Sequence, residues 1–158
     1  ALYKFKNYNF IFTASNADEE GSEINEMIKK HVHKNKNAFY VKSFGQKYYF
    51  SMLNNIDGVI GNSSSGITEV PSFKIGTINV GKRQDGRIKC ESIINCKAKD
   101  KEIIKSIRTA ISIKFRKEIS KLKNPYEKKN TVKNTNRVLI NYKLNQNLIK
   151  KFYEKKKK

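Results

Sequence analysis

The sequence is poor in several residue types that mark particular classes of protein. It has no tryptophan, two prolines, two cysteines and only 14 acidic residues among 158. Two cysteines, Cys90 and Cys96, are too few for the disulfide framework of a small secreted protein. No apolar run approaches the roughly 18 residues that cross a bilayer, and no signal-peptide pattern follows Ala1. We therefore expect a cytoplasmic protein with reduced thiols, and the absence of an initial methionine suggests a fragment of a longer chain.

The positive charge is large but unevenly distributed. Lysine and arginine number 34, which gives a net charge of +20 and an isoelectric point near 9.9. Residues 1–96 hold 13 basic and 9 acidic side chains, whereas residues 97–158 hold 21 and 5. Arginine, the better reader of bases and phosphates, is scarce where the charge is densest. Solvated helix faces explain this pattern better than a nucleic-acid or membrane partner, and we expect neither.

The first half of the chain alternates between strand and helix patterns. Short runs rich in aromatic and branched residues predict strands at 9–13, 38–41, 57–61 and 76–80. Ile24, Ile28 and Val32 recur at helical spacing between the first two strands, and helices are also expected around 48–53 and 66–72. This alternation predicts an α/β fold, a Rossmann-like parallel sheet with helices on both faces.

The second half of the chain is predicted to form two helices. Asp100 is expected to cap a helix that reaches about Lys121 and turns Ile103, Ile107, Ile111 and Phe115 toward the core. Residues 124–126 break this pattern, and a last helix is predicted over 134–153. Its apolar stripe, which needs a covering surface, consists of Val138, Leu139, Tyr142, Leu148, Ile149 and Phe152. We accordingly predict a nucleotide-binding domain at 1–122 and a linker with a C-terminal helix at 123–158.

The turn after the third predicted strand has the composition of an anion site. It reads Gly61-Asn62-Ser63-Ser64-Ser65-Gly66-Ile67-Thr68-Glu69. Hydroxyl groups and free backbone N–H groups at the start of a helix bind phosphate oxygens. Glu69 follows Ser64 by ~7.5 Å along a helix axis, within reach of the ribose of a bound nucleotide. The alternative is that the serines only cap a helix and that Glu69 is a surface residue. The pattern is neither a phosphate loop nor a dinucleotide fingerprint.

A second basic turn follows the fourth predicted strand. It contains Arg83 and Arg87 between the glycines at 81 and 86. In a parallel sheet this turn lies at the same edge as the serine-rich turn, so its guanidinium groups could neutralise the same diphosphate. An ordinary surface turn is the alternative. Cys90 and Cys96 fit no metal spacing, so no metal site is expected.

These blocks together resemble the second domain of the hydrolysing UDP-N-acetylglucosamine 2-epimerases of sialic acid and capsule biosynthesis. The resemblance rests on the serine-rich turn, on Asn79-x-Gly81-x-Arg83-Gln84-x-Gly86-Arg87 and on flanking segments near Asn16 and Asn124. The non-hydrolysing epimerases carry Ser-Gly-Gly where this chain has residues 63–66. The resemblance therefore favours the hydrolysing branch.

The resemblance implies the second half of a glycosyltransferase-B-type fold, with the nucleotide sugar between two Rossmann-like domains. Residues 123–158 would then cross back to a first domain that this chain lacks, and the full-length protein would be a homo-oligomer. Tyr49 falls near the base in the family, although core packing of its helix is an equal alternative. The implied nucleotide contacts are Ser63 and Ser64 to the diphosphate, Arg83 beside it, Glu69 to the ribose, Asn16 to the nucleotide and the Phe44 backbone to uracil.

The resemblance also implies the reaction. UDP is eliminated from UDP-N-acetylglucosamine to give a glycal, and water is then added to release N-acetylmannosamine, without an organic cofactor. The acid and base groups belong to the family's first domain and to a histidine upstream of Ala1, so no catalytic residue is assigned here. His31 and His33 are expected to be solvated helix residues. We expect the chain alone to bind UDP weakly without epimerase activity.

Two other functions remain open at this point. Base identity is weakly encoded, so a hydrolysing epimerase of GDP-sugars, or another glycosyltransferase-B-type nucleotide-sugar enzyme, is the first alternative. A lysine-rich nucleic-acid-binding module is the second.

Overall fold

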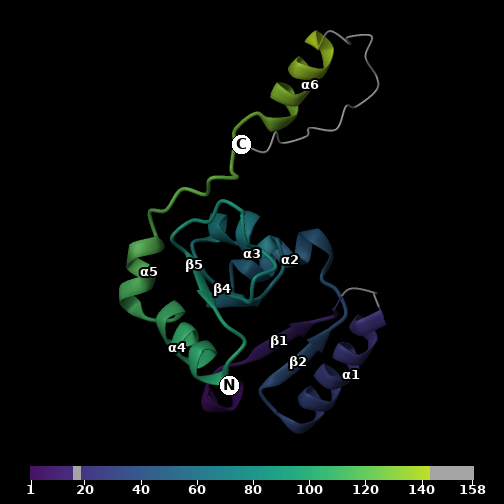
Figure 1. Ribbon diagram of the computed structural model, residues 1–158, viewed down its shortest axis with the longest axis vertical. Coiled ribbons are helices and arrows are strands. Elements are labelled where there is room, and N and C mark those ends of the chain that lie inside the picture. The colour runs from purple at the N-terminus through teal and green to yellow at the C-terminus, as the bar shows by residue number, and fades with distance from the viewer. Residues whose placement is uncertain (16–18, 143–158) are drawn as a thin grey trace, which may run out of the picture. The chain divides into compact units, whose positions relative to one another are not determined.

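The computed structural model describes residues 1–15 and 19–142, which divide into two compact units after Glu127 (Figure 1). Unit 1 holds the strands β1 (Phe10–Thr13), β2 (Ala38–Val41), β3 (Gly58–Gly61), β4 (Gly76–Val80) and β5 (Ile93–Cys96). Its helices are α1 (Glu19–Lys34), α2 (Gly45–Leu53), α3 (Ser65–Thr68), α4 (Asp100–Ala110) and α5 (Ile113–Ile119), with 3-10 turns η1 (Leu2–Lys4) and η2 (Val70–Phe73). Unit 2 holds α6 (Thr131–Asn141).

All strand pairs in unit 1 are parallel, which confirms the predicted α/β, Rossmann-like class. β1 pairs with β2, and β3, β4 and β5 pair in that order. The four predicted strands are present, but the ladder is interrupted between β1 and β3, so the described residues form two sheets rather than one. Strands of four or five residues offer few ladder bonds. Side-chain packing of Phe10 against the core of the larger sheet holds β1 instead.

The sequence analysis missed β5. Its pattern mixes a buried Ile93 with an exposed Asn95 and follows no clean alternation, so periodicity gave no signal. In the structure β5 is recruited by β4. Ile93 lies in register with Thr77, and the Asn79 side-chain amide donates to Asn95 Oδ1 across the two strands at 2.8 Å.

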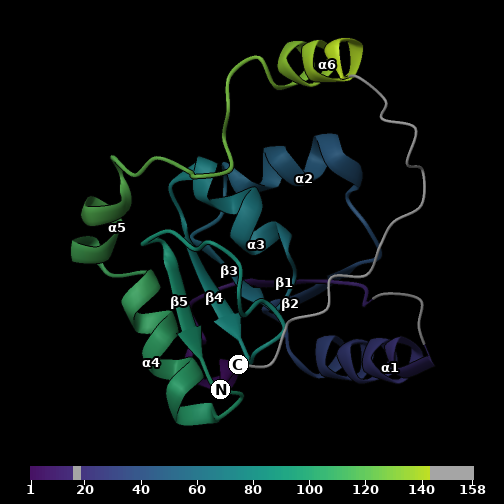
Figure 2. The same ribbon diagram turned by 45° about the horizontal axis from the view of Figure 1, so that its top comes forward.

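Helices cover both faces of the β3–β4–β5 sheet. On one face Ile78 packs against α4, and Gly76 lies so close to this layer that a Cβ there would meet Ala110 at 3.1 Å. On the other face Thr77 contacts α3. Figure 2 shows α4 beside β5 and β4, with α3 on the opposite side of these strands. This sandwich is the predicted arrangement.

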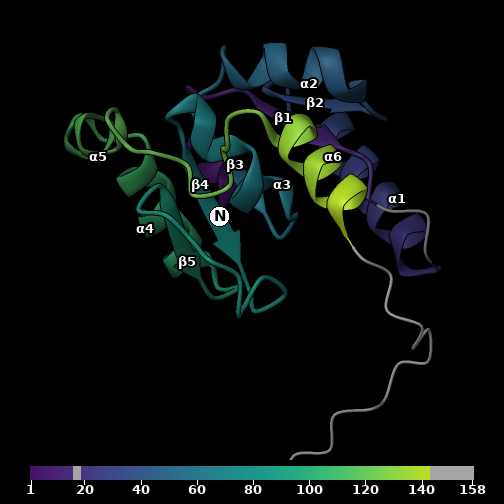
Figure 3. The ribbon, with the colours of Figure 1, turned by 90° about the horizontal axis from the view of Figure 1, so that it is seen from above.

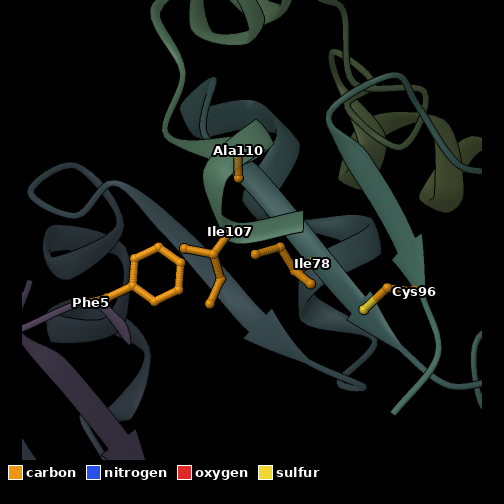
Figure 4. Packing of buried hydrophobic residues seen from close by; sticks show 5 residues of the cluster. All are labelled: Phe5, Ile78, Cys96, Ile107 and Ala110. Carbon is orange, nitrogen blue, oxygen red and sulfur yellow. The ribbon is translucent and has the colours of Figure 1, made fainter. Parts of the chain in front are cut away.

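A cluster of buried apolar residues lies between α4 and this sheet. It consists of Phe5, Ile78, Cys96, Ile107 and Ala110. Figure 4 shows Ile107 between the Phe5 ring and Ile78. The predicted apolar face of α4 is thereby confirmed, with Ile107 4% exposed and Ile103 and Ile111 partly buried against the cluster.

The helix predicted from Asp100 to Lys121 is wrong in two respects. It is broken at Ser112, whose extended backbone begins a new helix and whose hydroxyl accepts from the Phe115 amide at 3.2 Å. A serine side chain that bonds to the backbone competes with helix continuation. Asp100 is the first helical residue rather than the cap. The side chain that reaches back across this helix start is Glu102, which accepts from the Lys97 amide at 3.0 Å.

Helix α1 packs against β2. The prediction that both of its histidines are solvated is wrong for His31. His31 is half-buried, with its ring 5.5 Å from that of Phe12 in an edge-to-face arrangement, and it is therefore not a solvated residue. The Asn35 side chain lies 3.4 Å from His31 Nδ1. His33 is exposed, as expected.

Unit 2 begins after the break at residues 124–126. Helix α6, the yellow-green helix of Figure 3, starts at Thr131 rather than at 134 and ends at Asn141. Val138, Leu139 and Tyr142 of the predicted apolar stripe are exposed in the structure. The remainder of that stripe lies outside the described residues, and the proposed domain limits at 1–122 and 123–158 stay a prediction. Among the described residues no helix is both long enough and apolar enough to traverse a bilayer.

The Ile107 packing generates a stability test. Ile107→Ala removes most of a buried side chain from the centre of the cluster, so we expect the free energy of unfolding to fall by about 2–5 kcal/mol. Ile113→Ala is the matched control, because Ile113 is 75% exposed, and it should change stability by no more than about 0.5 kcal/mol. Urea unfolding of both variants measures the difference. Equal effects would show that the cluster is not the core.

Candidate functional site

The serine-rich turn lies exposed at the carboxyl end of β3. Asn62, Ser63 and Ser64 are exposed, and Ser65 is half-buried at the start of α3. Ser64 occupies the position before the helix, yet its side chain makes no capping bond. Ser63 Oγ accepts a long hydrogen bond of 3.4 Å from the Ser65 amide. The hydroxyl of Ser64 is thus not used as a cap, whereas Ser63 bonds to the first residue of α3.

The helix that follows this turn is shorter than predicted. α3 ends at Thr68, and the chain continues through Glu69 into the 3-10 turn η2. A helix of four residues carries only a small macrodipole, because few peptide units align. Any anion affinity of the turn must therefore come mainly from hydroxyl and amide donors and from nearby cations. Glu69 lies at the junction of the two helical turns and is half-buried.

The turn after β4 is joined directly to the serine turn. Gly81 and Gly86 adopt left-handed backbone conformations, with φ of 82° and 80°, that other residues rarely adopt. Arg83 between them is exposed, whereas the next residue, Gln84, is 4% exposed. Gln84 Nε2 donates to the Asn62 carbonyl at 2.7 Å. This bond spans the ends of two adjacent parallel strands and brings the Arg83 turn against the serine turn.

Tyr49 of α2 contacts the serine turn from a third side. Its hydroxyl lies 2.7 Å from Ser65 Oγ, so α2 is linked to the start of α3. Burial raises the pKa of the Tyr49 phenol above its ordinary value, the Ser65 hydrogen bond opposes this shift, and the charge of Glu69 adds to it. The phenol therefore stays protonated at neutral pH. Tyr49 is half-buried and is tied to the site rather than packed only in the core.

Close packing fixes the position of α3 on the sheet. The Thr77 hydroxyl donates to the Gly66 carbonyl at 2.8 Å. A Cβ at Gly66 would lie 2.8 Å from Thr77 Cγ2, closer than such atoms approach, so only glycine fits between α3 and β4.

The 124–126 segment fixes the far end of the same helical turns. The Asn124 side-chain amide donates to the Thr68 carbonyl and to Ser72 Oγ, both at 2.8 Å. Asn124 Oδ1 accepts from the Tyr126 amide at 3.0 Å. Asn124, which is distant in the sequence, thereby holds the segment that carries Glu69.

The structure brings together four of the six predicted nucleotide contacts. Ser63, Ser64 and Glu69 share one continuous segment, and the Gln84 bond places the Arg83 turn beside it. Phe44 is half-buried and lies immediately before α2, the helix whose Tyr49 reaches Ser65. Asn16 lies outside the described residues.

A separate basic depression lies on α4. It has a volume of about 380 Å³ and is lined by Lys101, Ile104, Lys105, Arg108, Thr109 and Ser112. Because α4 covers the face of the sheet opposite α3, this depression is distinct from the serine turn.

Comparison with known proteins identifies the family of this chain. The sequence profile of the family described as UDP-N-acetylglucosamine 2-epimerase matches residues 1–140. The chain belongs to this family. The UDP-N-acetylglucosamine 2-epimerase family profile therefore covers β1 to β5 and the serine and Arg83 turns.

Several relatives carry descriptive names. The polysialic acid biosynthesis protein P7 of Escherichia coli is 37% identical over 98% of this chain and 40% of its own length. A hydrolysing GDP/UDP-N,N'-diacetylbacillosamine 2-epimerase of Campylobacter jejuni is 42% identical over 63% of this chain and 26% of its own. The UDP-N-acetylglucosamine 2-epimerase of Neisseria meningitidis is 36% identical over 42% and 18%, respectively. The chain thus spans two fifths or less of each relative.

The sequence analysis assigned no role to Gln84 and left Tyr49 undecided. Gln84 was visible only as part of the block 79–87, because a buried glutamine in a polar turn has no periodic signal. The Tyr49 hydroxyl contact depends on how α2 packs on α3, which one sequence does not specify. Both residues lie in segments that follow strands, Tyr49 in α2 after β2 and Gln84 in the turn after β4, and this position is the sequence signal they share.

The Tyr49–Ser65 contact generates a test with a defined pH dependence. Tyr49→Phe removes one hydrogen bond, so we expect the free energy of unfolding to fall by about 0.5–1.5 kcal/mol at pH 7. The folded-state pKa of Tyr49 is raised, so above the unfolded value of about 10 the folded state holds more protons and loses stability as the pH rises. The difference in free energy of unfolding between wild type and Tyr49→Phe should therefore become smaller above pH ~10.

Urea unfolding of both proteins from pH 7 to pH 11 measures this difference, in which other titrating groups cancel. A difference that stays constant across this range would show that the phenol ionises equally in both states.

Proposed function

We propose that this chain supplies the nucleotide-binding residues of a hydrolysing 2-epimerase that acts on UDP-N-acetylglucosamine. Family membership supports a nucleotide-sugar epimerase, and the name of the Campylobacter relative specifies a hydrolysing enzyme. The observation that carries the proposal is the joined pair of turns. An exposed run of amides and hydroxyls at 62–64 lies beside an exposed arginine at the carboxyl edge of a parallel sheet.

Each predicted residue has a role in this proposal. Ser63 and Ser64 donate to the diphosphate oxygens, and Arg83 supplies the positive charge that uncharged donors lack. Glu69 accepts from the ribose hydroxyls. The backbone beside Phe44 contacts the uracil, and Asn16 approaches the nucleotide from the end of β1.

These contacts assist the reaction by stabilising UDP as the leaving group. In the elimination a base takes the proton from C2 of the sugar, and the C1–O bond breaks with its electron pair passing to UDP. Water then adds across the C1–C2 double bond of the glycal and yields N-acetylmannosamine. Donors around the diphosphate stabilise the charge that develops on UDP as it leaves. The acid and base that handle the C2 proton and the water are supplied, in this proposal, by residues outside the 158.

The same proposal includes partners of the binding half. The chain covers 40% of the length of the P7 protein, so the remaining length is expected to provide a first Rossmann-like domain facing the serine turn. The exposed apolar side chains of α6, such as Leu139 and Ile140, would pack on that domain. The complete protein would act as a homo-oligomer in the cytoplasm.

A GDP-sugar remains the second candidate substrate for one specific reason. The Campylobacter relative, 42% identical over 100 residues, is named for both GDP- and UDP-linked sugars. The proposed diphosphate and ribose contacts are common to both nucleotides, so only the base contacts near Phe44 would discriminate between them.

The binding proposal is tested by calorimetry with UDP and GDP. We expect UDP to bind the wild-type chain more tightly than GDP. Glu69→Ala should weaken UDP binding by roughly 1–3 kcal/mol through loss of charge-assisted hydrogen bonds. Ser63→Ala with Ser64→Ala should also weaken it. Ser51→Ala is the matched control, since the hydroxyl of this exposed serine of α2 donates to the Lys47 carbonyl within the same helix, and the change should leave affinity unchanged.

Four results would contradict the proposal or a part of it. Tighter binding of GDP would replace the uridine assignment, and an unchanged affinity in Glu69→Ala would remove Glu69 from the site. Steeply salt-dependent DNA binding that survives Ser63→Ala with Glu69→Ala would favour a nucleic-acid module instead. With UDP-N-acetylglucosamine as substrate, the 158-residue chain should release no N-acetylmannosamine, and release at enzyme-like rates would show that the catalytic groups lie within it.

A further inference from the structure

Gln84 makes the hydrogen bond that joins the two turns, and only one end of its buried amide group has a partner among the described residues. Its side chain is 4% exposed, and its Nε2 donates to the Asn62 carbonyl at 2.7 Å. Its Oε1 is buried and has no hydrogen-bond partner among the described residues. We propose that Gln84 is a positioning residue for nucleoside diphosphate binding, which acts by fixing the peptide unit between Asn62 and Ser63. This inference rests on the proposed function of the serine turn and assigns a role to a residue outside the predicted contacts.

The geometry of the peptide bond relates the direction of the Ser63 N–H to that of the Asn62 carbonyl. The Asn62 carbonyl and the Ser63 N–H belong to one planar, trans peptide unit, in which the two groups point in opposite directions. Gln84 holds the carbonyl from the buried side. The Ser63 N–H is consequently directed away from the interior, on the exposed side of the turn where the diphosphate is proposed to bind.

The same hydrogen bond also connects the two turns. Gln84 directly follows Arg83, and the hydrogen bond to Asn62 spans 22 positions in the sequence. One bond therefore sets both the direction of the Ser63 amide and the distance between the serine turn and the Arg83 backbone. Pre-organised donors bind an anion more tightly than mobile ones, because less freedom is lost on binding.

The unpaired Gln84 Oε1 indicates that stability alone does not explain a glutamine at this position. A buried acceptor without a partner destabilises the folded state, and an apolar side chain of the same length would avoid that cost. A glutamine at this position is thus poorly explained by stability alone. Gln84→Met keeps the length and volume, removes the bond to Asn62 and also removes the unpaired oxygen. The two effects on stability oppose each other, whereas the effect on the turn does not cancel.

The test compares wild type, Gln84→Met and Ser92→Ala. Ser92 is a fully buried polar residue just before β5, and its hydroxyl lies 3.2 Å from Cys90 Sγ rather than near the serine turn, so it serves as the matched control. We expect Gln84→Met to raise the Kd for UDP about five- to tenfold, while its melting temperature stays within about 2 °C of wild type. Ser92→Ala should leave the Kd unchanged.

A second readout does not depend on nucleotide. In the ligand-free protein the carbonyl 13C shift of Asn62 and the amide shift of Ser63 should move in Gln84→Met and stay fixed in Ser92→Ala. Unmoved shifts would overturn the positioning role, as would an unchanged Kd for UDP in Gln84→Met. A fall in melting temperature large enough to unfold Gln84→Met would equally overturn it and assign a structural role. Absence of UDP binding by wild type would instead reject the proposed function, with the shifts still deciding how the turn is held.

Discussion

The parallel pairing of β3 with β4 is the constraint on which the site depends. In register from Gly58 and Gly76 onward, the two strands end at the same edge of the sheet, so the turns that follow them must be neighbours. Two side chains then convert proximity into a fixed arrangement. Thr77, within β4, binds the Gly66 carbonyl, and Gln84, just beyond β4, binds the Asn62 carbonyl. The serine turn is thus held at both ends by residues of one neighbouring strand and its turn.

The site is built from uncharged donors with a few charges at its border. Asn62, Ser63 and Ser64 are exposed, and the short α3 contributes little dipole, so in the proposed site cations such as Arg83 would supply the long-range attraction for an anion. The overall charge of +20 is a different property, because most of it lies beyond residue 96. The basic depression on α4 belongs to that excess, on the other face of the sheet. Within unit 1, the basic depression and the serine turn therefore lie on opposite faces of the sheet.

The sequence predicted those elements whose signal is local. β2 and β4 were placed at their observed bounds because branched and aromatic residues cluster there, and Ile107 was placed in the core by helical spacing. β5 was missed because its burial depends on pairing with β4, and the break at Ser112 was missed because one serine bond to Phe115 outweighed a regular apolar period. His31 was misjudged because its contact with Phe12 comes from another element. The serine and arginine turns were found from composition, whereas the roles of Gln84 and Tyr49 required the packing of α2, α3 and the β4 turn.

In the function that we propose, a uridine diphosphate binds the joined turns after β3 and β4. The most direct measurement of this binding is a residue-resolved NMR titration of the amide 1H–15N resonances with UDP. The account predicts that the largest shifts occur together at residues 62–64, at Glu69 and at residues 83–84. Shifts confined to the α4 depression around Lys101 and Lys105, with the serine turn unmoved, would contradict it.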